Sequence, residues 1–188
     1  MCSVSTAFNY TANIFVKDLA TGRIANLTGS DETIGDPSSP HSFFRPAWSP
    51  DGEWLAFSSD INTDWTGHSN GTGWELTQAL ALYVVRADGT DFLKVVGQAS
   101  FCLATPKWSP DGRSLLHDNM TVEATYNAHG TSGQQAATAS QIFRADVATD
   151  LNVKQLTSSD SFKVSAQYVG RSEKTGYLVK AGDGAGLN

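Results

Sequence analysis

AWSPDGEWLAFSS, residues 47–59, is followed sixty residues later by KWSPDGRSLLHDN, residues 107–119. The two stretches share the pentapeptide Trp-Ser-Pro-Asp-Gly, and apolar residues follow it in both. An identity of this length is too long to arise from composition in a chain of 188 residues. Internal repetition has to be tested first, because a repeated unit decides the class of fold.

The shared Ser-Pro-Asp-Gly sequence predicts a tight turn. Proline sets the backbone φ angle of the first corner, aspartate tolerates the second, and glycine accepts the conformation at the exit. Apolar or alternating residues flank each turn, which is the pattern of a β-hairpin. We therefore expect Gly52 and Gly112 to share a backbone conformation that penalises a Cβ atom. We also expect Trp48 and Trp108 to be buried between adjacent units.

A second type of hairpin occurs three times. It is found in NIFVKDLATGRIANLT from Asn13, in ALYVVRADGTDFLKVV from Ala81 and in QIFRADVATDLNVKQLT from Gln141. Tyr168 follows Trp108 by a further sixty residues, so KVSAQYVGRSEKTGYLVK contains a diverged copy of the first hairpin. The chain thus consists of half a unit, two whole units and another half unit, and each whole unit has four antiparallel strands.

Four-stranded units in tandem are typical of β-propeller blades. The predicted fold class is all-β, a partial β-propeller of about three four-stranded antiparallel blades. A β-sandwich with two similar hairpins is the alternative. The predicted division is a loop or disordered segment, the second half of a blade, two blades and the first half of a blade, at residues 1–12, 13–28, 46–96, 105–157 and 164–180.

The repeat resembles that of TolB-like propellers, whose hallmark is the Trp-Ser-Pro-Asp-Gly turn, then an Ile/Leu-Tyr/Phe strand and an Asp-x-x-Gly turn. The resemblance covers about residues 13–180 and is specific for the fold but not for a function. Such repeats occur in periplasmic translocation proteins, in propeller caps of prolyl-oligopeptidase-like enzymes and in some propeller polysaccharide lyases. The resemblance therefore leaves the activity open.

The number of blades creates a problem, since propellers typically close with about 4–8 blades. We expect the chain to be a fragment of a longer propeller; the alternative is that its half-blades pair with another copy. The strands at residues 13–19 and 175–180 would then be open sheet edges. Because unpaired edges recruit other strands, self-association of the chain is expected.

Composition restricts the classes of function. With 40% hydrophobic and 17% charged residues, the chain is typical of a globular protein. It has no run of about 18 apolar residues, so no membrane span is expected. The net charge of −6 and the scattered lysines and arginines argue against a nucleic-acid partner. The N-terminal residues do not form a signal peptide as written.

The remaining sequence signals are few. Cys2 and Cys102 form neither a disulfide framework nor a zinc site by spacing, and no metal or cofactor is expected. The Asn-x-Ser/Thr sites suggest a secretory history, which favours a secreted or periplasmic parent protein without establishing its compartment. These sites are at Asn9, Asn26, Asn70 and Asn119.

Loop length indicates which face of the propeller carries function. In an up-and-down blade the tight turns lie at one face, and the other connections lie at the opposite face. The long segments 29–43, 59–80, 97–104 and 118–140 all fall on that opposite face, which we call the long-loop face. Long connections are usually functional or disordered. We therefore expect a protein or carbohydrate ligand to bind there.

The segment 59–80 contains Trp65, His68, Trp74 and Glu75. Aromatic faces stack on sugar rings and polar side chains bind hydroxyl groups, so Trp65, Trp74 and Glu75 are predicted ligand-binding residues. Alternatively, both tryptophans anchor a long loop to the blade.

Four other residues of this face could contact a ligand. Arg45 could bind a carboxylate through two hydrogen bonds, and His41 could transfer a proton near neutral pH. Tyr126 and His129 lie in a second long segment, where His129 is a predicted ligand-binding residue. Each also has an alternative: an ordinary loop residue for the histidines and tyrosine, and a salt bridge for Arg45.

His117 is different, because it occupies the position of Phe57, nine residues after the repeated tryptophan. We interpret it as a hydrogen-bonded histidine between blades.

No hydrolase triad or zinc motif is present, so whether the chain belongs to an enzyme stays open. The predicted function is a binding or interaction platform. The alternative is a polysaccharide lyase acting next to a uronic acid, with Arg45 neutralising the carboxylate and His41 or His68 with Tyr126 as acid and base. A third possibility is a propeller that gates a peptidase.

Overall fold

The computed structural model describes residues 12–28, 43–59, 61, 79–101, 105–119, 140–147, 152–159 and 161–180. Within these ranges every regular element is a β-strand, as the sequence predicts. Within them, no helix is long and apolar enough to cross a membrane.

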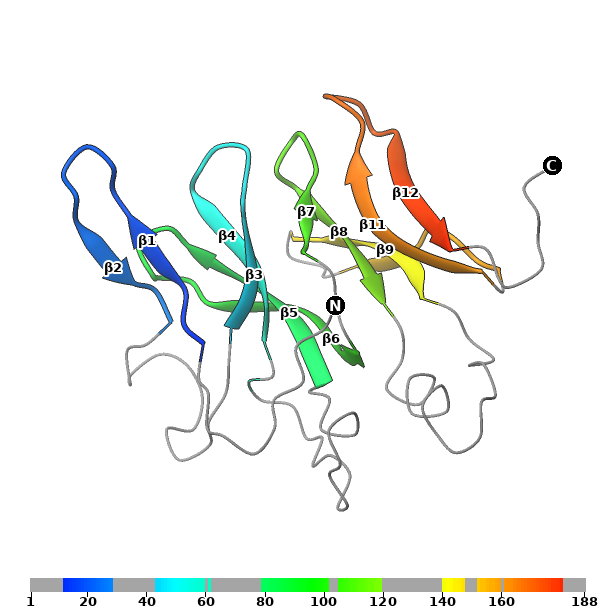
Figure 1. Cartoon of the computed structure of the whole chain (residues 1–188), viewed down its shortest axis with the longest axis horizontal. Helices are drawn as coiled ribbons and strands as arrows, with labels where there is room; N and C mark the ends of the chain where they lie inside the picture. The colour runs from blue at the N-terminus through cyan, green and yellow to red at the C-terminus, as the bar shows by residue number, and fades with distance from the viewer. Residues whose placement is uncertain are drawn as a thin grey trace, which may run out of the picture.

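The strands form four antiparallel sheets that follow one another across the molecule in chain order (Figure 1). The N-terminal sheet contains β1 (Phe15–Lys17) and β2 (Ile24–Asn26). The first full sheet contains β3 (Phe43–Trp48), β4 (Trp54–Ser59), β5 (Ala79–Arg86) and β6 (Leu93–Phe101). The second full sheet contains β7 (Lys107–Trp108), β8 (Ser114–Asn119), β9 (Gln141–Asp146) and β10 (Val153–Gln155). The C-terminal sheet contains β11 (Phe162–Tyr168) and β12 (Thr175–Lys180).

In both full sheets the strands are hydrogen-bonded in chain order, so β3 and β7 are edge strands that we call inner strands. Their counterpart in the C-terminal sheet is β11, because Tyr168 pairs with Thr175 as Trp108 pairs with Leu115. The N-terminal sheet corresponds instead to the outer two strands of a full sheet. Its Leu27 N–H donates to the Ile14 carbonyl, as Leu156 N–H donates to the Ile142 carbonyl beside β9 and β10.

The two Ser-Pro-Asp-Gly turns have the same structure. In the first, the Gly52 N–H donates to the Ser49 carbonyl and the Ser49 hydroxyl accepts from the Trp54 N–H. The second repeats both bonds from Gly112 and Ser114 to Ser109. Gly52 and Gly112 have φ angles of 76° and 71°, a left-handed conformation in which a Cβ atom is strained. The predicted shared conformation is confirmed.

Hydrophobic contacts between neighbouring sheets form the core. On β4, alternate residues face opposite neighbours, as the two-residue period of a strand requires. Leu55 and Phe57 pack with Ile14, which directly precedes β1 of the N-terminal sheet, whereas Ala56 packs with Leu115 of the second full sheet. A smaller cluster joins the second full sheet to the C-terminal sheet. Each sheet is therefore stabilised mainly by the sheets beside it.

The two repeated tryptophans differ in burial. Trp108 is 9% exposed and its Nε1 donates to the Ala47 carbonyl on β3, at 2.9 Å. Trp48 is 47% exposed, so the prediction that both are buried is wrong for Trp48. The reason is that Trp108 packs against the inner strand of the preceding sheet. The N-terminal sheet offers Trp48 no such strand among the described residues.

His117 is 2% exposed and stacks on Phe143 at a centroid distance of 5.6 Å. Among the described residues, neither of its ring nitrogens has a hydrogen-bond partner. The interpretation of His117 as a hydrogen-bonded histidine is therefore wrong. It replaces Phe57 in the repeat and keeps the aromatic contact with the neighbouring strand. The sequon residue Asn119 is 8% exposed in the folded chain.

Candidate functional site

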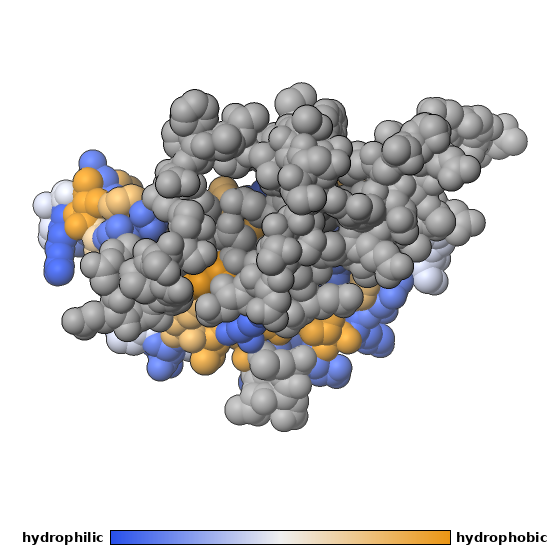
Figure 2. Space-filling view, turned by 90° about the horizontal axis from the view of Figure 1, so that it is seen from below, coloured by the Kyte–Doolittle hydropathy of each residue, from blue (hydrophilic) through white to orange (hydrophobic). Residues whose placement is uncertain are grey.

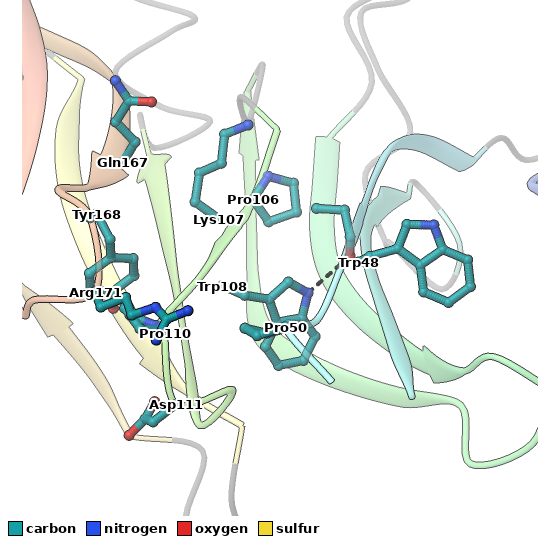
Figure 3. A pocket seen from close by; sticks show the side chains of 12 residues that line it. Trp48, Pro50, Pro106, Lys107, Trp108, Pro110, Asp111, Gln167, Tyr168 and Arg171 are labelled. Atoms are coloured by element: carbon teal, nitrogen blue, oxygen red, sulfur yellow. Dashed lines mark hydrogen bonds between the residues drawn. The ribbon is translucent and has the colours of Figure 1, made fainter. Parts of the chain in front are cut away.

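A pocket of about 890 Å³ lies along the inner strands β3, β7 and β11, at the end where their turns begin (Figure 3). The lining residues come from these three strands and from the turns that follow them: Ala47, Trp48, Pro50, Pro106, Lys107, Trp108, Pro110, Asp111, Gln167, Tyr168, Gly170 and Arg171. The sixty-residue repeat brings these residues together, because it places one aromatic residue at the same end of each inner strand.

The aromatic residues take different positions in the pocket. The Trp108 ring lies against β3, whereas the Trp48 indole is directed away from Trp108 (Figure 3). Tyr168 is held by its hydroxyl, which lies 3.1 Å from the Ser114 Oγ on β8. Three prolines complete the lining, and their fixed φ angles limit the movement of its backbone. The pocket is therefore a pre-formed surface with apolar rings.

Charge in the pocket favours an anion. Lys107 and Arg171 contribute two positive charges, and Asp111 is the one carboxylate among the lining residues. The Ser109 hydroxyl and the Arg113 backbone N–H donate to Asp111 and hold the pKa of its carboxyl below the usual value. Asp111 therefore stays ionised at neutral pH, and its carboxylate accepts hydrogen bonds within the turn. One excess positive charge remains, in a chain whose net charge is −6.

The lining residues suit binding better than acid–base chemistry. They include no histidine, serine or cysteine, and Asp111, already ionised, is a poor general acid. Among the described residues, no group of three or more histidine, cysteine, aspartate or glutamate side chains could hold a metal ion. The arrangement can hold a ligand that carries an apolar ring face and an anionic group.

This pocket is at the end of the sheets opposite to the predicted long-loop face. The turns lie at the upper end in Figure 1, whereas β4 and β8 end at Ser59 and Asn119 at the other end. Most of the predicted site residues lie outside the described residues, so their roles stay predictions: His41, Trp65, His68, Trp74, Glu75, Tyr126 and His129.

Arg45 is the predicted site residue that the structure describes. It is half-buried on β3, at a bulge between Phe44 and Ala47, and its φ angle is 59°. Ser165 has a φ angle of 58° at the corresponding bulge of β11. Since two inner strands share this conformation, the bulge is a feature of the repeat. The ligand-binding role of Arg45 stays a prediction.

Lys163 is a buried cation that the sequence analysis missed. It is 7% exposed, and its Nζ donates to the Gln141 Oε1 and the Ser161 carbonyl at 3.3 and 3.1 Å and also contacts the Ser159 hydroxyl. By donating to these neutral oxygens, Lys163 connects the start of β11 with the start of β9. A signal was present, because Lys163 occupies the repeat position of Phe43, and a charge at an apolar repeat position indicates a local polar network.

Among known proteins, one relative is similar to part of this chain. No protein-family model matches the chain. Over 108 residues, or 57% of this chain, the sequence is 31% identical to the uncharacterized peptidase YuxL of Bacillus subtilis (strain 168). The match covers 13% of that peptidase, so most of the relative has no counterpart here.

Solved structures similar to the chain are β-propeller proteins. TolB from Acinetobacter baumannii matches 89% of this chain and 34% of its own, with a TM-score of 0.50 and 18% identity. A structure from a study of two prolyl endopeptidases matches 88% of this chain and 22% of its own, with a TM-score of 0.58 and 15% identity. A puromycin hydrolase matches 83% of this chain and 22% of its own, with a TM-score of 0.51 and 15% identity. At these identities the likeness shows the fold alone. The predicted fold, a β-propeller with about three four-stranded blades in this chain, is confirmed.

Proposed function

We propose that this chain is a TolB-like propeller region that works as a binding platform and does not itself catalyse a reaction. The observation that carries the proposal is the pocket along β3, β7 and β11, which combines aromatic rings with Lys107 and Arg171. Its ligand is an anionic molecule with at least one apolar ring face. The rings supply stacking area, and the cations supply charge-assisted hydrogen bonds to the anionic group.

Titration calorimetry with an acidic oligosaccharide and a neutral oligosaccharide of the same length tests this proposal. The acidic ligand should bind, and its affinity should fall as salt is added, because the attraction is partly electrostatic. Lys107→Gln and Arg171→Gln should each weaken binding about tenfold, equivalent to about 1.4 kcal/mol. Lys154→Gln on β10, an exposed lysine outside the pocket, is the matched control. Equal binding of both oligosaccharides would contradict the proposed anion preference.

The long-loop face is a second proposed ligand surface of the same platform. Its support is topological: in both full sheets the second strand ends, and the third begins, at the end opposite to the turns. Trp65 and Trp74 belong to the segment that joins β4 to β5. Replacing both with alanine should reduce binding of a ligand at this face without changing the free energy of unfolding. A large loss of stability would instead identify the tryptophans as anchors of the segment.

A second candidate function is that of a propeller that gates a peptidase. The specific observation is the 31% identity with the uncharacterized peptidase of Bacillus subtilis. An antibody raised against this chain can capture the native protein from its cells, and a fluorophosphonate probe then reports an active serine. Labelling of the captured polypeptide would support the peptidase. Absence of labelling, with ligand binding by the pocket, would support the platform.

The lyase hypothesis gains no support from the described residues or from the proteins named above. Its proposed acid and base, His41 or His68 with Tyr126, lie outside the described residues. The absorbance of unsaturated sugar products, followed in the same samples as the calorimetry, gives an independent test of it.

A further inference from the structure

We infer that the first and second full sheets bind at least one ordered water molecule between them, bridging Ser58 of β4 to His117 and Asn119 of β8. None of these three residues lines the ligand pocket, so this internal water site is independent of the proposed function. The directions, burial and hydrogen-bonding chemistry of the three side chains support it.

The three side chains point into the same space between the two sheets. Ala56 of β4 and Leu115 of β8 belong to the core cluster that joins these sheets. Side chains of a strand repeat their direction every two residues, so Ser58 points the same way as Ala56. By the same rule, His117 and Asn119 point the same way as Leu115. Both strands keep an uninterrupted register with their partners β5 and β9, so no bulge changes these directions.

The polar side chains also lie at matching levels along the two strands. Ser58 is two residues beyond Ala56, and His117 is two residues beyond Leu115, which corresponds to about 7 Å along each strand. β4 and β8 end at Ser59 and Asn119, at the end of the sheets from which Figure 2 views the molecule. The space between the sheets is therefore apolar in its middle and polar next to this end.

Burial makes hydrogen bonds necessary for these groups. Ser58, His117 and Asn119 are 0%, 2% and 8% exposed. Among the described residues, the Ser58 Oγ, both ring nitrogens of His117 and the Asn119 Oδ1 have no hydrogen-bond partner. Buried polar groups are paired with protein or with ordered water in nearly all folded proteins. Three such residues on facing strands therefore indicate a shared partner.

The chemistry of the groups fits water. Burial lowers the pKa of His117 to about 4, so at neutral pH its ring is uncharged and offers one donor and one acceptor. The Ser58 hydroxyl can donate or accept, and the Asn119 Oδ1 accepts. A buried water typically makes about three hydrogen bonds, as donor and as acceptor, which matches this mixed set.

A metal ion fits the site less well than water. His117 is the one histidine among the three residues, and serine and asparagine contribute no charge. Within the part of the chain that the structure describes, no group of three or more histidine, cysteine, aspartate or glutamate side chains could hold a metal ion. An uncharged occupant therefore suits the site.

The neighbouring interface has a different composition at the same level. There Phe57 takes the position of His117 and stacks on Tyr83, at a centroid distance of 6.1 Å. The Tyr83 hydroxyl donates to the Ile61 carbonyl at 2.6 Å, so it has a partner within the protein. The internal water site is therefore specific to the interface between the two full sheets.

Ser58→Ala is the first test, because the sign of its effect separates a hydrated site from a dry one. If the Ser58 hydroxyl is bonded to water, its removal should lower the urea midpoint of unfolding. Removal of an unpaired buried hydroxyl should instead raise the midpoint. A raised or unchanged midpoint would overturn the proposed site.

Ser114→Ala is the matched control for this change. The Ser114 hydroxyl is also buried, but it points to the opposite neighbour and lies 3.1 Å from the Tyr168 hydroxyl. Its removal should lower the midpoint whether or not the water site exists. Circular dichroism checks that each variant is folded.

A double variant tests whether one water links the two strands. If it does, Ser58→Ala and His117→Phe each disrupt the same bridge, and at pH 7 the change in the double variant should differ from the sum of the single changes. His117→Phe combined with Ser114→Ala should be additive, because these side chains point to opposite neighbours. Additive changes in both pairs would overturn the bridge.

Oxygen-17 relaxation dispersion counts the water molecules that stay bound while the protein tumbles. At pH 7 the count should fall by at least one when Ser58→Ala and His117→Phe are combined, and it should stay unchanged in Ser114→Ala. Equal counts in the unsubstituted chain and the double variant would overturn the internal water site.

Discussion

Trp108 and Trp48 begin the same pentapeptide, but the protein surrounds them differently. Trp108 is 9% exposed and bonded to the Ala47 carbonyl, whereas Trp48 is 47% exposed. The turns that follow them have the same hydrogen bonds and nearly the same glycine φ angles. Local sequence therefore determines the turn, but the neighbouring sheet determines whether the tryptophan belongs to the core.

The largest expected effect is on the free energy of unfolding. Trp108→Ala should lower it by about 3–5 kcal/mol, the usual cost of removing a large buried aromatic side chain. Trp48→Ala should lower it by less than about 1 kcal/mol, because most surface substitutions have small effects. Urea denaturation of both variants, at a concentration where the chain is monomeric, measures the difference. Equal losses would mean that Trp48 is covered within a single copy.

The second comparison is between His117 and Phe57, which occupy the same repeat position. Burial lowers the pKa of His117 to about 4. The folded protein therefore holds His117 neutral while the unfolded chain binds a proton below about pH 6.5. The free energy of unfolding should show no loss from His117 above that pH. It should fall as the pH drops towards 4, by about 3 kcal/mol in total.

His117→Phe tests this prediction, since phenylalanine fits the corresponding position of the first full sheet and can keep the contact with Phe143. The variant should lose the pH dependence between about 6.5 and 4 and should be at least as stable as the unsubstituted chain at pH 4. Denaturant midpoints at several pH values give the measurement. An unchanged pH profile would show that another group titrates in this window.

The sequence predicted the strands and turns well, because both depend on residues close together in the chain. The sixty-residue spacing and the Ser-Pro-Asp-Gly turn placed the hairpins around Gly52 and Gly112 correctly. The sequence did not predict the burial of Trp48 or the missing hydrogen bonds of His117. Both depend on the sheet beside them, and a repeat pattern assumes that every unit has the same neighbours.

The candidate pocket was also beyond the sequence analysis. Its lining residues lie in short strands and tight turns, whereas the sequence predicted function at the long connections of the other face. Lys107 and Arg171 are far apart in the chain and belong to different sheets, so nothing local links them. They line one pocket because β7 and β11 are equivalent strands of the repeat. That equivalence is hard to see in the sequence, because β11 belongs to the diverged hairpin around Tyr168.

A smaller loss of stability is expected when the turn glycines are replaced, and it should be equal in the two repeated turns. Gly52→Ala and Gly112→Ala should each cost about 1 kcal/mol, because alanine is strained in a left-handed conformation. No atom lies within 4 Å of a Cβ added at Gly52, and the nearest at Gly112 is 3.8 Å away, so the cost is conformational. Gly176→Ala in β12 is the control, since that glycine has no positive φ angle and should lose no stability. Unequal costs at the two turns would show that they are not locally determined.

The smallest expected effect concerns the exposed contact between the second full sheet and the C-terminal sheet. The Arg144 Nη1 lies 3.2 Å from the Glu173 Oε2, but the two side chains are 37% and 62% exposed. Water and salt screen such a pair, so Glu173→Gln should cost less than about 0.5 kcal/mol and still less at high salt. Asp91→Asn, which breaks the exposed pair with Arg86 inside one sheet, should behave similarly and serves as the control. If Glu173→Gln costs as much as Trp108→Ala, the sheets are joined mainly by charge, and burial between neighbours is not what separates Trp108 from Trp48.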